Sequence, residues 1–101
     1  MSETERPAIL IVDDEAYNLD LLERTLKRDY EVARAENGQT ALDLLPTLPN
    51  LALIITDQRM PGRSGLDLLA EVRNTRPEIT RVLLSGFSDL PETVPMPSWP
   101  T

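Results

Sequence analysis

Two short apolar runs, each ending on a carboxylate, constrain the fold of this chain more than any other feature of its sequence. Ala8–Val12 contain no polar side chain and stop at Asp13-Asp14, and Leu51–Thr56 are nearly as apolar and stop at Asp57. Runs of this length are typical of strands that are buried on both faces, as in parallel sheets. Since parallel neighbours need long crossover connections, helices are expected between the strands.

The segments between and after these runs fit that expectation. Two further strands are predicted at Tyr30–Ala35 and Ile79–Leu84, and three helices are predicted from apolar residues at helical spacing. The helices are Glu15–Arg28 with Leu19, Leu22 and Leu26; a helix from Asn37-Gly38 with Ala41, Leu44, Leu45 and Leu48, disturbed by Pro46; and a helix from Ser64 to before Pro77, with Leu66, Leu69 and Val72 on one face. This alternation predicts an α/β fold, a doubly wound and mainly parallel sheet with helices on both faces.

Composition narrows the chemistry that such a domain can perform. The 101 residues suit one domain, and 17 acidic against 10 basic residues give a net charge of −7, which argues against direct nucleic-acid binding. The absence of cysteine and histidine excludes thiol chemistry and the commonest general base, and leaves carboxylates as the candidate metal ligands and nucleophiles. No apolar run approaches the ~20 residues of a membrane span, so we expect a cytoplasmic protein without a membrane partner.

The three strand-end carboxylates are the candidate site. If the first and third strands are neighbours, as in a 2-1-3-4 order, Asp13, Asp14 and Asp57 converge outside the carboxyl ends of the strands, where such sheets bind ligands. Their mutual repulsion would be relieved by a hard divalent cation, Mg²⁺ above all, and one carboxylate could then attack phosphorus to give an aspartyl phosphate. Taken singly, Asp13-Asp14 also fit a helix cap, and Asp57 fits an ordinary turn.

Three motifs in order resemble the response-regulator receiver domain. They are Ile9-Leu10-Ile11-Val12-Asp13-Asp14-Glu15, Asp57-Gln58-Arg59-Met60-Pro61-Gly62 followed by Gly65, and Val82-Leu83-Leu84-Ser85-Gly86. The resemblance covers about residues 7–89 and implies a flavodoxin-like sheet of strand order 2-1-3-4. A phosphatase of the haloacid-dehalogenase type is disfavoured, because Asp13-Asp14-Glu15 does not match the D-x-D-x-T pattern of that class.

The resemblance also implies a set of roles in two-component signalling. Asp57 is expected to accept a phosphoryl group from a histidine kinase or phosphotransfer protein. Ser85 is the expected switch hydroxyl. Mg²⁺ is expected on Asp13, Asp14, Asp57 and the backbone carbonyl of Arg59. Such a domain is a signalling switch rather than an enzyme, with self-catalysed phosphorylation and dephosphorylation at most. Its downstream partner is not identified by the sequence.

The chain departs from the family pattern after the fourth strand. We expect a partial receiver domain at residues 1–89 and a proline-rich tail at 90–101, with the fifth strand, its lysine and the last helices missing; the sole lysine is Lys27, in the first predicted helix. An uncovered edge at Ile79–Leu84 predicts a homodimer, a domain swap or poor stability, unless Met96 and Trp99 of the tail cover that surface. The alternative function is a degenerate receiver that works only as an interaction or dimerisation module.

Overall fold

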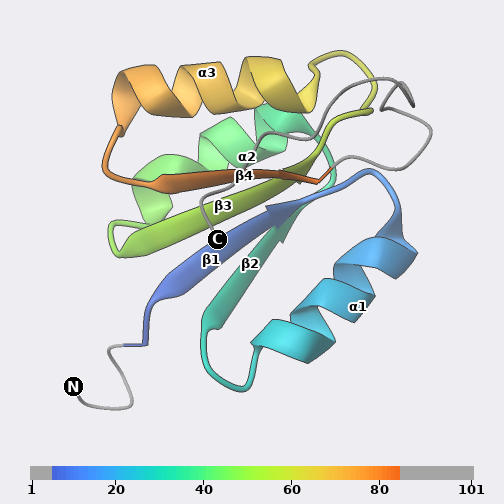
Figure 1. Ribbon diagram of the computed structural model, residues 1–101, viewed down its shortest axis with the longest axis vertical. Coiled ribbons are helices and arrows are strands. Elements are labelled where there is room, and N and C mark those ends of the chain that lie inside the picture. The colour runs from blue at the N-terminus through green and yellow to red at the C-terminus, as the bar shows by residue number, and fades with distance from the viewer. Residues whose placement is uncertain (1–5, 85–101) are drawn as a thin grey trace, which may run out of the picture.

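The structure, a computed structural model, describes residues 6–84. Strands and helices alternate through this part of the chain (Figure 1), as the sequence predicted: β1 (Ala8–Val12), α1 (Ala16–Leu26), β2 (Glu31–Ala35), α2 (Gly38–Leu44), the short 3₁₀ helix η2 (Leu45–Thr47), β3 (Leu51–Asp57), α3 (Gly65–Thr75) and β4 (Thr80–Leu84). The described strands are parallel and lie in the order β2-β1-β3-β4. The predicted doubly wound fold of receiver type is therefore confirmed.

The element boundaries differ from the predicted ones by a few residues. Helix α1 begins after Glu15, whose backbone is extended. It ends at Leu26, and Lys27 is the capping residue that follows it. The second helix changes after Leu44 into the 3₁₀ turn that contains Pro46, because proline lacks the N–H that an α-helix would use there. Strand β3 includes Asp57, so the carboxylate lies at the strand's last position rather than in the following loop.

One residue of a predicted helix face was misassigned. We predicted Leu66, Leu69 and Val72 on one face of the third helix; Val72 is buried and Leu69 packs against the same core, but Leu66 is 57% exposed and Leu68 is fully buried. Leu68 and Val72 are four residues apart and therefore lie on the same side of α3, whereas Leu66 is two residues before Leu68 and lies nearly opposite. Two overlapping helical spacings in this leucine-rich segment led to the error.

Alternation along β1 divides the apolar residues between two cores. Ala8, Leu10 and Val12 face α2 and α3, where they join a larger core that also contains Ile54, Leu68 and Val72. Ile9 and Ile11 face the other way and pack with Leu19 of α1. All five residues of β1 are buried, as predicted for the central strand of a sheet covered on both faces.

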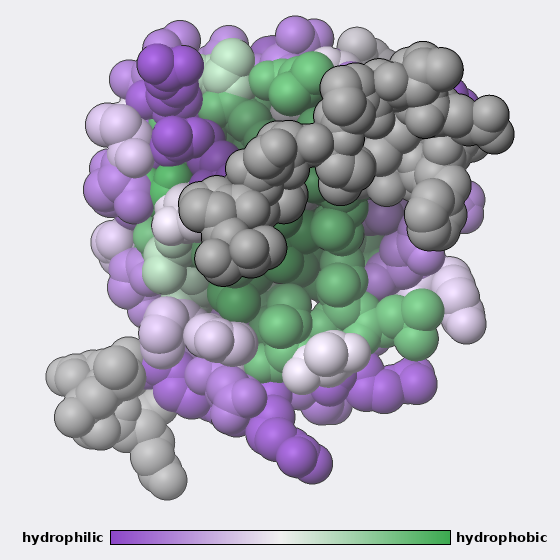
Figure 2. Space-filling view, in the orientation of Figure 1, coloured by the Kyte–Doolittle hydropathy of each residue, from purple (hydrophilic) through white to green (hydrophobic). Residues whose placement is uncertain are grey.

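The α1 side of the sheet is less completely covered by the described residues than the other side. Leu53 and Ile55 of β3 are only partly buried, and Leu84 at the end of β4 is 43% exposed. In the view of Figure 2, hydrophobic residues gather in the middle of the molecule and hydrophilic residues surround them. Strand β4 is the outermost strand of the described sheet, which leaves its outer edge without a partner strand among residues 6–84.

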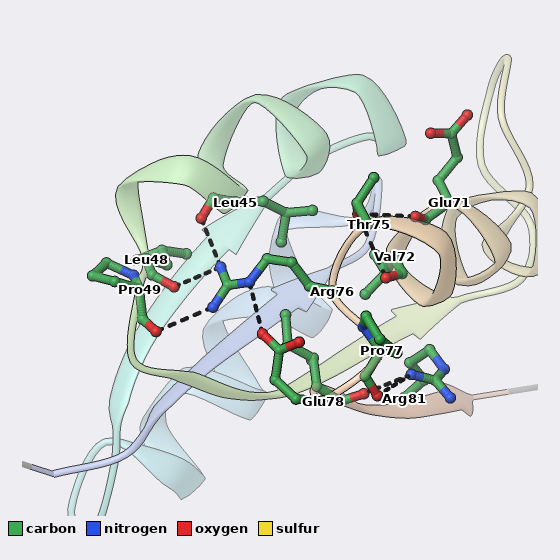
Figure 3. Close-up of polar contacts among 11 residues, drawn as sticks. Leu45, Leu48, Pro49, Glu71, Val72, Thr75, Arg76, Pro77, Glu78 and Arg81 are labelled. Carbon is green, nitrogen blue, oxygen red and sulfur yellow. Dashed lines mark hydrogen bonds and ion pairs between the residues drawn. The ribbon is translucent and has the colours of Figure 1, made fainter.

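A single arginine joins the end of α3 to the connection that leads into β3 (Figure 3). Nη1 of Arg76 donates to the carbonyl oxygens of Leu45 and Leu48, both at 2.9 Å, and its Nη2 donates to that of Pro49 at 3.1 Å. Its Nε also donates to Glu78, at 3.0 Å. The carbonyl groups of Leu45 and Leu48 also accept the backbone N–H groups of Leu48 and Leu51, at 3.1 and 3.2 Å, so Arg76 gives each of them a second donor.

None of the helices described between residues 6 and 84 is long and apolar enough to cross a bilayer.

Candidate functional site

The register of the sheet brings the strand-end carboxylates together. Val12 of β1 pairs with Thr56 of β3, so the residues that follow them, Asp13 and Asp57, lie side by side at the carboxyl edge of the sheet. Carboxylate oxygens of Asp13, Asp14 and Asp57 all lie within 4.8 Å of one another. The convergence that the sequence predicted from a 2-1-3-4 order is therefore present.

The three carboxylates differ in exposure and in how firmly they are held. Asp13 is buried, Asp57 is half-buried and Asp14 is exposed. The backbone N–H of Asp13 continues the sheet by donating to the carbonyl of Ala35 at 3.1 Å. Its carboxylate accepts the backbone N–H of Glu15 at 2.9 Å and the side-chain amide of Asn18 at 3.2 Å. Asp13 is thus fixed within the protein, whereas Asp14 faces the solvent beside it.

The backbone of Asp57 is constrained by its neighbours on two sides. The fully buried hydroxyl of Thr56 donates to the carbonyl oxygen of Asp57 at 2.9 Å. Gly65, the first residue of α3, packs so closely that a β-carbon there would collide with the same carbonyl oxygen and would lie 2.8 Å from Leu83. A side chain at position 65 would therefore push the start of α3 away from the end of β3.

The loop after Asp57 is tied to the start of α3. Gln58 accepts the backbone N–H of Gly65 on its carbonyl at 3.0 Å and that of Leu66 on its side chain at 2.9 Å. Ser64 caps the helix by accepting the N–H of Asp67 at 3.1 Å. Gly62 has a φ of +83°, a conformation that glycine adopts readily and that permits a sharp turn.

Two shallow grooves meet at Asp14. One is lined by Asp14, Gln58, Arg59, Met60, Pro61 and Ser64. The other extends towards the start of α2 and is lined by Asp14, Glu36–Gln39, Pro61–Arg63 and Asp67. Arg59 itself is exposed and borders the first groove, two residues from Asp57. Asp14, where the two grooves meet, is therefore accessible from the solvent.

Of the remaining residues of the sequence prediction, one falls outside the described part of the chain and one lies away from the carboxylates. Ser85, the predicted switch hydroxyl, lies outside the described residues and stays a prediction, although its neighbour Leu84 pairs with Asp57 in the sheet. Lys27 is exposed at the far end of α1, one residue beyond an 11-residue helix that begins beside Asp13 and Asp14. A helix of that length spans about 16 Å, so the ammonium group of Lys27 does not reach the carboxylates.

The donor set suits a hard cation. Carboxylate oxygens are the ligands that Mg²⁺ prefers, and sites of this kind use one or two protein carboxylates and leave positions for water and phosphoryl oxygens. Three carboxylates on two neighbouring strands, one of them half-buried at a strand end, match that requirement. Sequence reasoning missed the contacts of Asn18 and Thr56. Thr56 carried a signal, since it is the polar residue at the end of an apolar strand.

This fold and carboxylate arrangement define a receiver domain of two-component signalling. The family model of the response regulator receiver domain matches residues 9–96 of the sequence. The chain belongs to that family.

Individual relatives agree. The chain is 42% identical over 81 residues to the hydrogenase transcriptional regulatory protein HoxA of Cupriavidus necator, covering 80% of this chain and 17% of that protein. It is 37% identical over 83 residues to the two-component response regulator ORR3 of rice, covering 79% and 63%. The chain thus spans less than two thirds of the length of these curated relatives.

Solved structures show the same fold. The signal receiver domain of an HD domain-containing protein from Pseudomonas fluorescens superimposes with a TM-score of 0.78 at 35% identity, over 84% of this chain and 68% of that one. The response regulator TrrA of Thermotoga maritima, solved in complex with Mg²⁺-BeF, gives a TM-score of 0.75 at 38% identity, over 82% of this chain and 72% of that one.

Proposed function

We propose that this chain accepts a phosphoryl group on Asp57 from a histidine kinase or phosphotransfer protein in a Mg²⁺-dependent reaction, and that the modification changes its protein interactions. The observation that supports the proposal is the meeting of Asp13, Asp14 and Asp57 within 4.8 Å at the carboxyl ends of β1 and β3. Family membership supplies the class of reaction, and the carboxylate geometry supplies the residues. The relative from Thermotoga maritima was solved with Mg²⁺-BeF, which supports the choice of cation.

The roles of the residues follow from their positions. An oxygen of Asp57 attacks phosphorus, and the bond from phosphorus to the donor nitrogen breaks with its electron pair staying on the donor. Asp13, Asp14 and Asp57, with the carbonyl group of Arg59, would hold Mg²⁺, which when bound would neutralise charge on the phosphoryl oxygens. Thr56 and Gly65 fix the backbone of the nucleophile, and Ser85 is proposed to hydrogen-bond the phosphoryl group after transfer. Self-catalysed phosphorylation and dephosphorylation would be the most catalysis that the domain performs.

The proposal is tested by intact-mass spectrometry. The purified chain is incubated with Mg²⁺ and a small acyl phosphate, beside an Asp57→Asn variant and an Asp29→Asn control at the far end of α1. We expect one phosphoryl group on the wild type and on the control, and none on Asp57→Asn or without Mg²⁺. Phosphorylation of Asp57→Asn, or none on a folded wild type, would overturn the proposal.

The second candidate is a degenerate receiver that acts only by binding. The position of Lys27 favours it, because the sole lysine of the 101 residues lies at the far end of α1 from the carboxylates. A folded wild type that gains no phosphoryl group would support this function.

We also propose that the outer edge of β4 mediates self-association. The half-buried Val82 and the exposed Leu84 lie on this outermost described strand, and unpaired edges of this kind pair readily with other chains. Light scattering after size exclusion should show a dimer whose population rises with protein concentration. A monomer at every concentration would contradict self-association through this edge.

A cytoplasmic location stays a prediction.

A further inference from the structure

The environment of Asp13 has a feature that the proposed roles do not use. Asp13 is 5% exposed, and each of its two carboxylate oxygens accepts a hydrogen bond from a separate donor. Oδ1 accepts the backbone N–H of Glu15 at 2.9 Å, and Oδ2 accepts Nδ2 of Asn18 at 3.2 Å. The backbone donor follows from the turn after β1 and is available to any sequence there. The amide donor depends on residue 18 being asparagine.

Asn18 is itself firmly placed. It is the third residue of α1, and its backbone N–H donates to the carbonyl of Glu15 at 3.1 Å, which begins the helix. Side chains in a helix lean towards its N-terminus, so the short amide of Asn18 is directed back at Asp13. Helix α1 is in turn anchored to the sheet by Leu19, which is fully buried against Ile9 and Ile11. The core therefore holds the backbone that carries the donor to Oδ2, although Asn18 itself is exposed.

The chemistry of an amide suits a carboxylate that must also bind a cation. Two donors, one on each oxygen, fix the orientation of the Asp13 carboxylate plane. An arginine or lysine at position 18 would do the same but would bring a positive charge next to the metal. A neutral donor restrains Asp13 without opposing a cation, and each carboxylate oxygen keeps a second lone-pair site for it.

We infer that Asn18 is a positioning residue of the metal site, which holds the Asp13 carboxylate in the orientation that binds Mg²⁺ next to Asp14 and Asp57. The inference rests on the proposed function. Without the amide, Oδ2 loses its protein donor and the carboxylate keeps only the contact with Glu15. Cation binding must then restore the order that Asn18 provides in the wild type. Loss of comparable outer-shell partners weakens metal affinity by about 10- to 100-fold.

The test compares Mg²⁺ affinity with stability in the absence of metal. Asn18→Leu keeps the approximate size of the side chain and removes the donor, and Asn18→Gln keeps an amide on a longer stem. Asn74→Leu makes the same asparagine-to-leucine exchange at an exposed position of α3, away from the site. Mg²⁺ is titrated into each metal-free protein by calorimetry, and urea unfolding is recorded without metal. We expect Asn18→Leu to bind Mg²⁺ about 10- to 100-fold more weakly, Asn18→Gln to recover part of the loss, and Asn74→Leu to match the wild type.

The outcomes separate this inference from the proposed function. If the wild type binds Mg²⁺ and Asn18→Leu binds it equally well, the inference fails and the proposed function stands. If Asn18→Leu and Asn18→Gln lose affinity only in proportion to a loss of metal-free stability, Asn18 is merely structural and the inference is again overturned. If the folded wild type itself shows no Mg²⁺ binding, the proposed function fails, and the inference fails with it.

Discussion

Replacing Arg76 by methionine should destabilise the whole domain, because one guanidinium group satisfies three backbone carbonyl groups ahead of β3. Methionine keeps much of the apolar stem of the side chain and removes the donors. The carbonyl oxygens of Leu45, Leu48 and Pro49, now bound at 2.9–3.1 Å, would lose these donors. Leu45 is a buried residue, and water has limited access to its carbonyl group.

The expected cost follows from the contacts. A hydrogen bond to a charged group contributes about 1.5–3 kcal/mol, but the exposed carbonyl of Pro49 can turn to water instead. The ion pair with Glu78 adds little, because the Glu78 side chain is 62% exposed. The carbonyl groups of Leu45 and Leu48 each keep a backbone N–H donor in the variant, so no buried acceptor is left unpaired. We therefore expect a loss of about 1–3 kcal/mol in the free energy of unfolding. For a domain of this size each kcal/mol corresponds to about 4–8 °C in Tm.

Urea unfolding followed by circular dichroism measures the loss of stability. Arg73→Met, at an exposed position of α3, is the matched control. Arg76→Lys separates charge from geometry, since an ammonium group is a point donor and cannot reproduce the planar fork on all three carbonyl groups. We expect the lysine variant to recover less than half of the lost stability. A change below about 0.5 kcal/mol in Arg76→Met, or full recovery in Arg76→Lys, would refute the assignment of stability to the fork.

Three further predictions concern the site and the core. Gly65→Ala should lower the free energy of unfolding by about 1–3 kcal/mol in urea, because the new β-carbon displaces the Asp57 carbonyl. The same displacement should weaken Mg²⁺ binding in calorimetry. A variant unchanged in both measurements would contradict the close packing. Leu68→Ala should cost about 2–5 kcal/mol, because Leu68 is fully buried, whereas Leu66→Ala should cost little. The pKa of Glu78 is lowered by its own backbone N–H and then by Arg76, so its stabilising effect is present above the usual value of 4.5 and lost as the pH falls below it. The unfolding midpoint of Glu78→Gln should therefore vary less than that of the wild type over this acidic range.

The sequence was sufficient to predict the sheet because the relevant signals are local. The apolar runs of β1 and β3 are short and typical of buried strands, and the carboxylates that end them are adjacent in the chain to the strands that place them. Once β1 and β3 are neighbours, the pairing of Val12 with Thr56 brings Asp13 beside Asp57 without any further information. The site was therefore predictable from the strand ends and the strand order.

Contacts between distant segments were not predictable in the same way. Arg76 lies 27–31 residues from the carbonyl groups it binds, and no periodicity in the sequence marks backbone acceptors. The buried face of α3 was missed for a related reason. Leu66 and Leu68 are equally apolar, and the choice between them is made by where the sheet lies, since Leu68 faces a core that includes Leu10 and Ile54.

Asn18 lies between these two cases, and it shows which part of the site depends on tertiary structure. Its distance of five residues from Asp13 is local, yet Asn18 is an exposed residue on the surface of a helix, and nothing in the sequence shows that its amide donates to Asp13. That contact depends on the angle at which α1 leaves the sheet, and Leu19 packing on Ile9 and Ile11 sets that angle. The carboxylates are thus specified by the strands that carry them, whereas the orientation of Asp13 depends on the core beneath α1. A substitution that shifts α1, such as Leu19→Ala, should therefore weaken Mg²⁺ binding without touching any ligand.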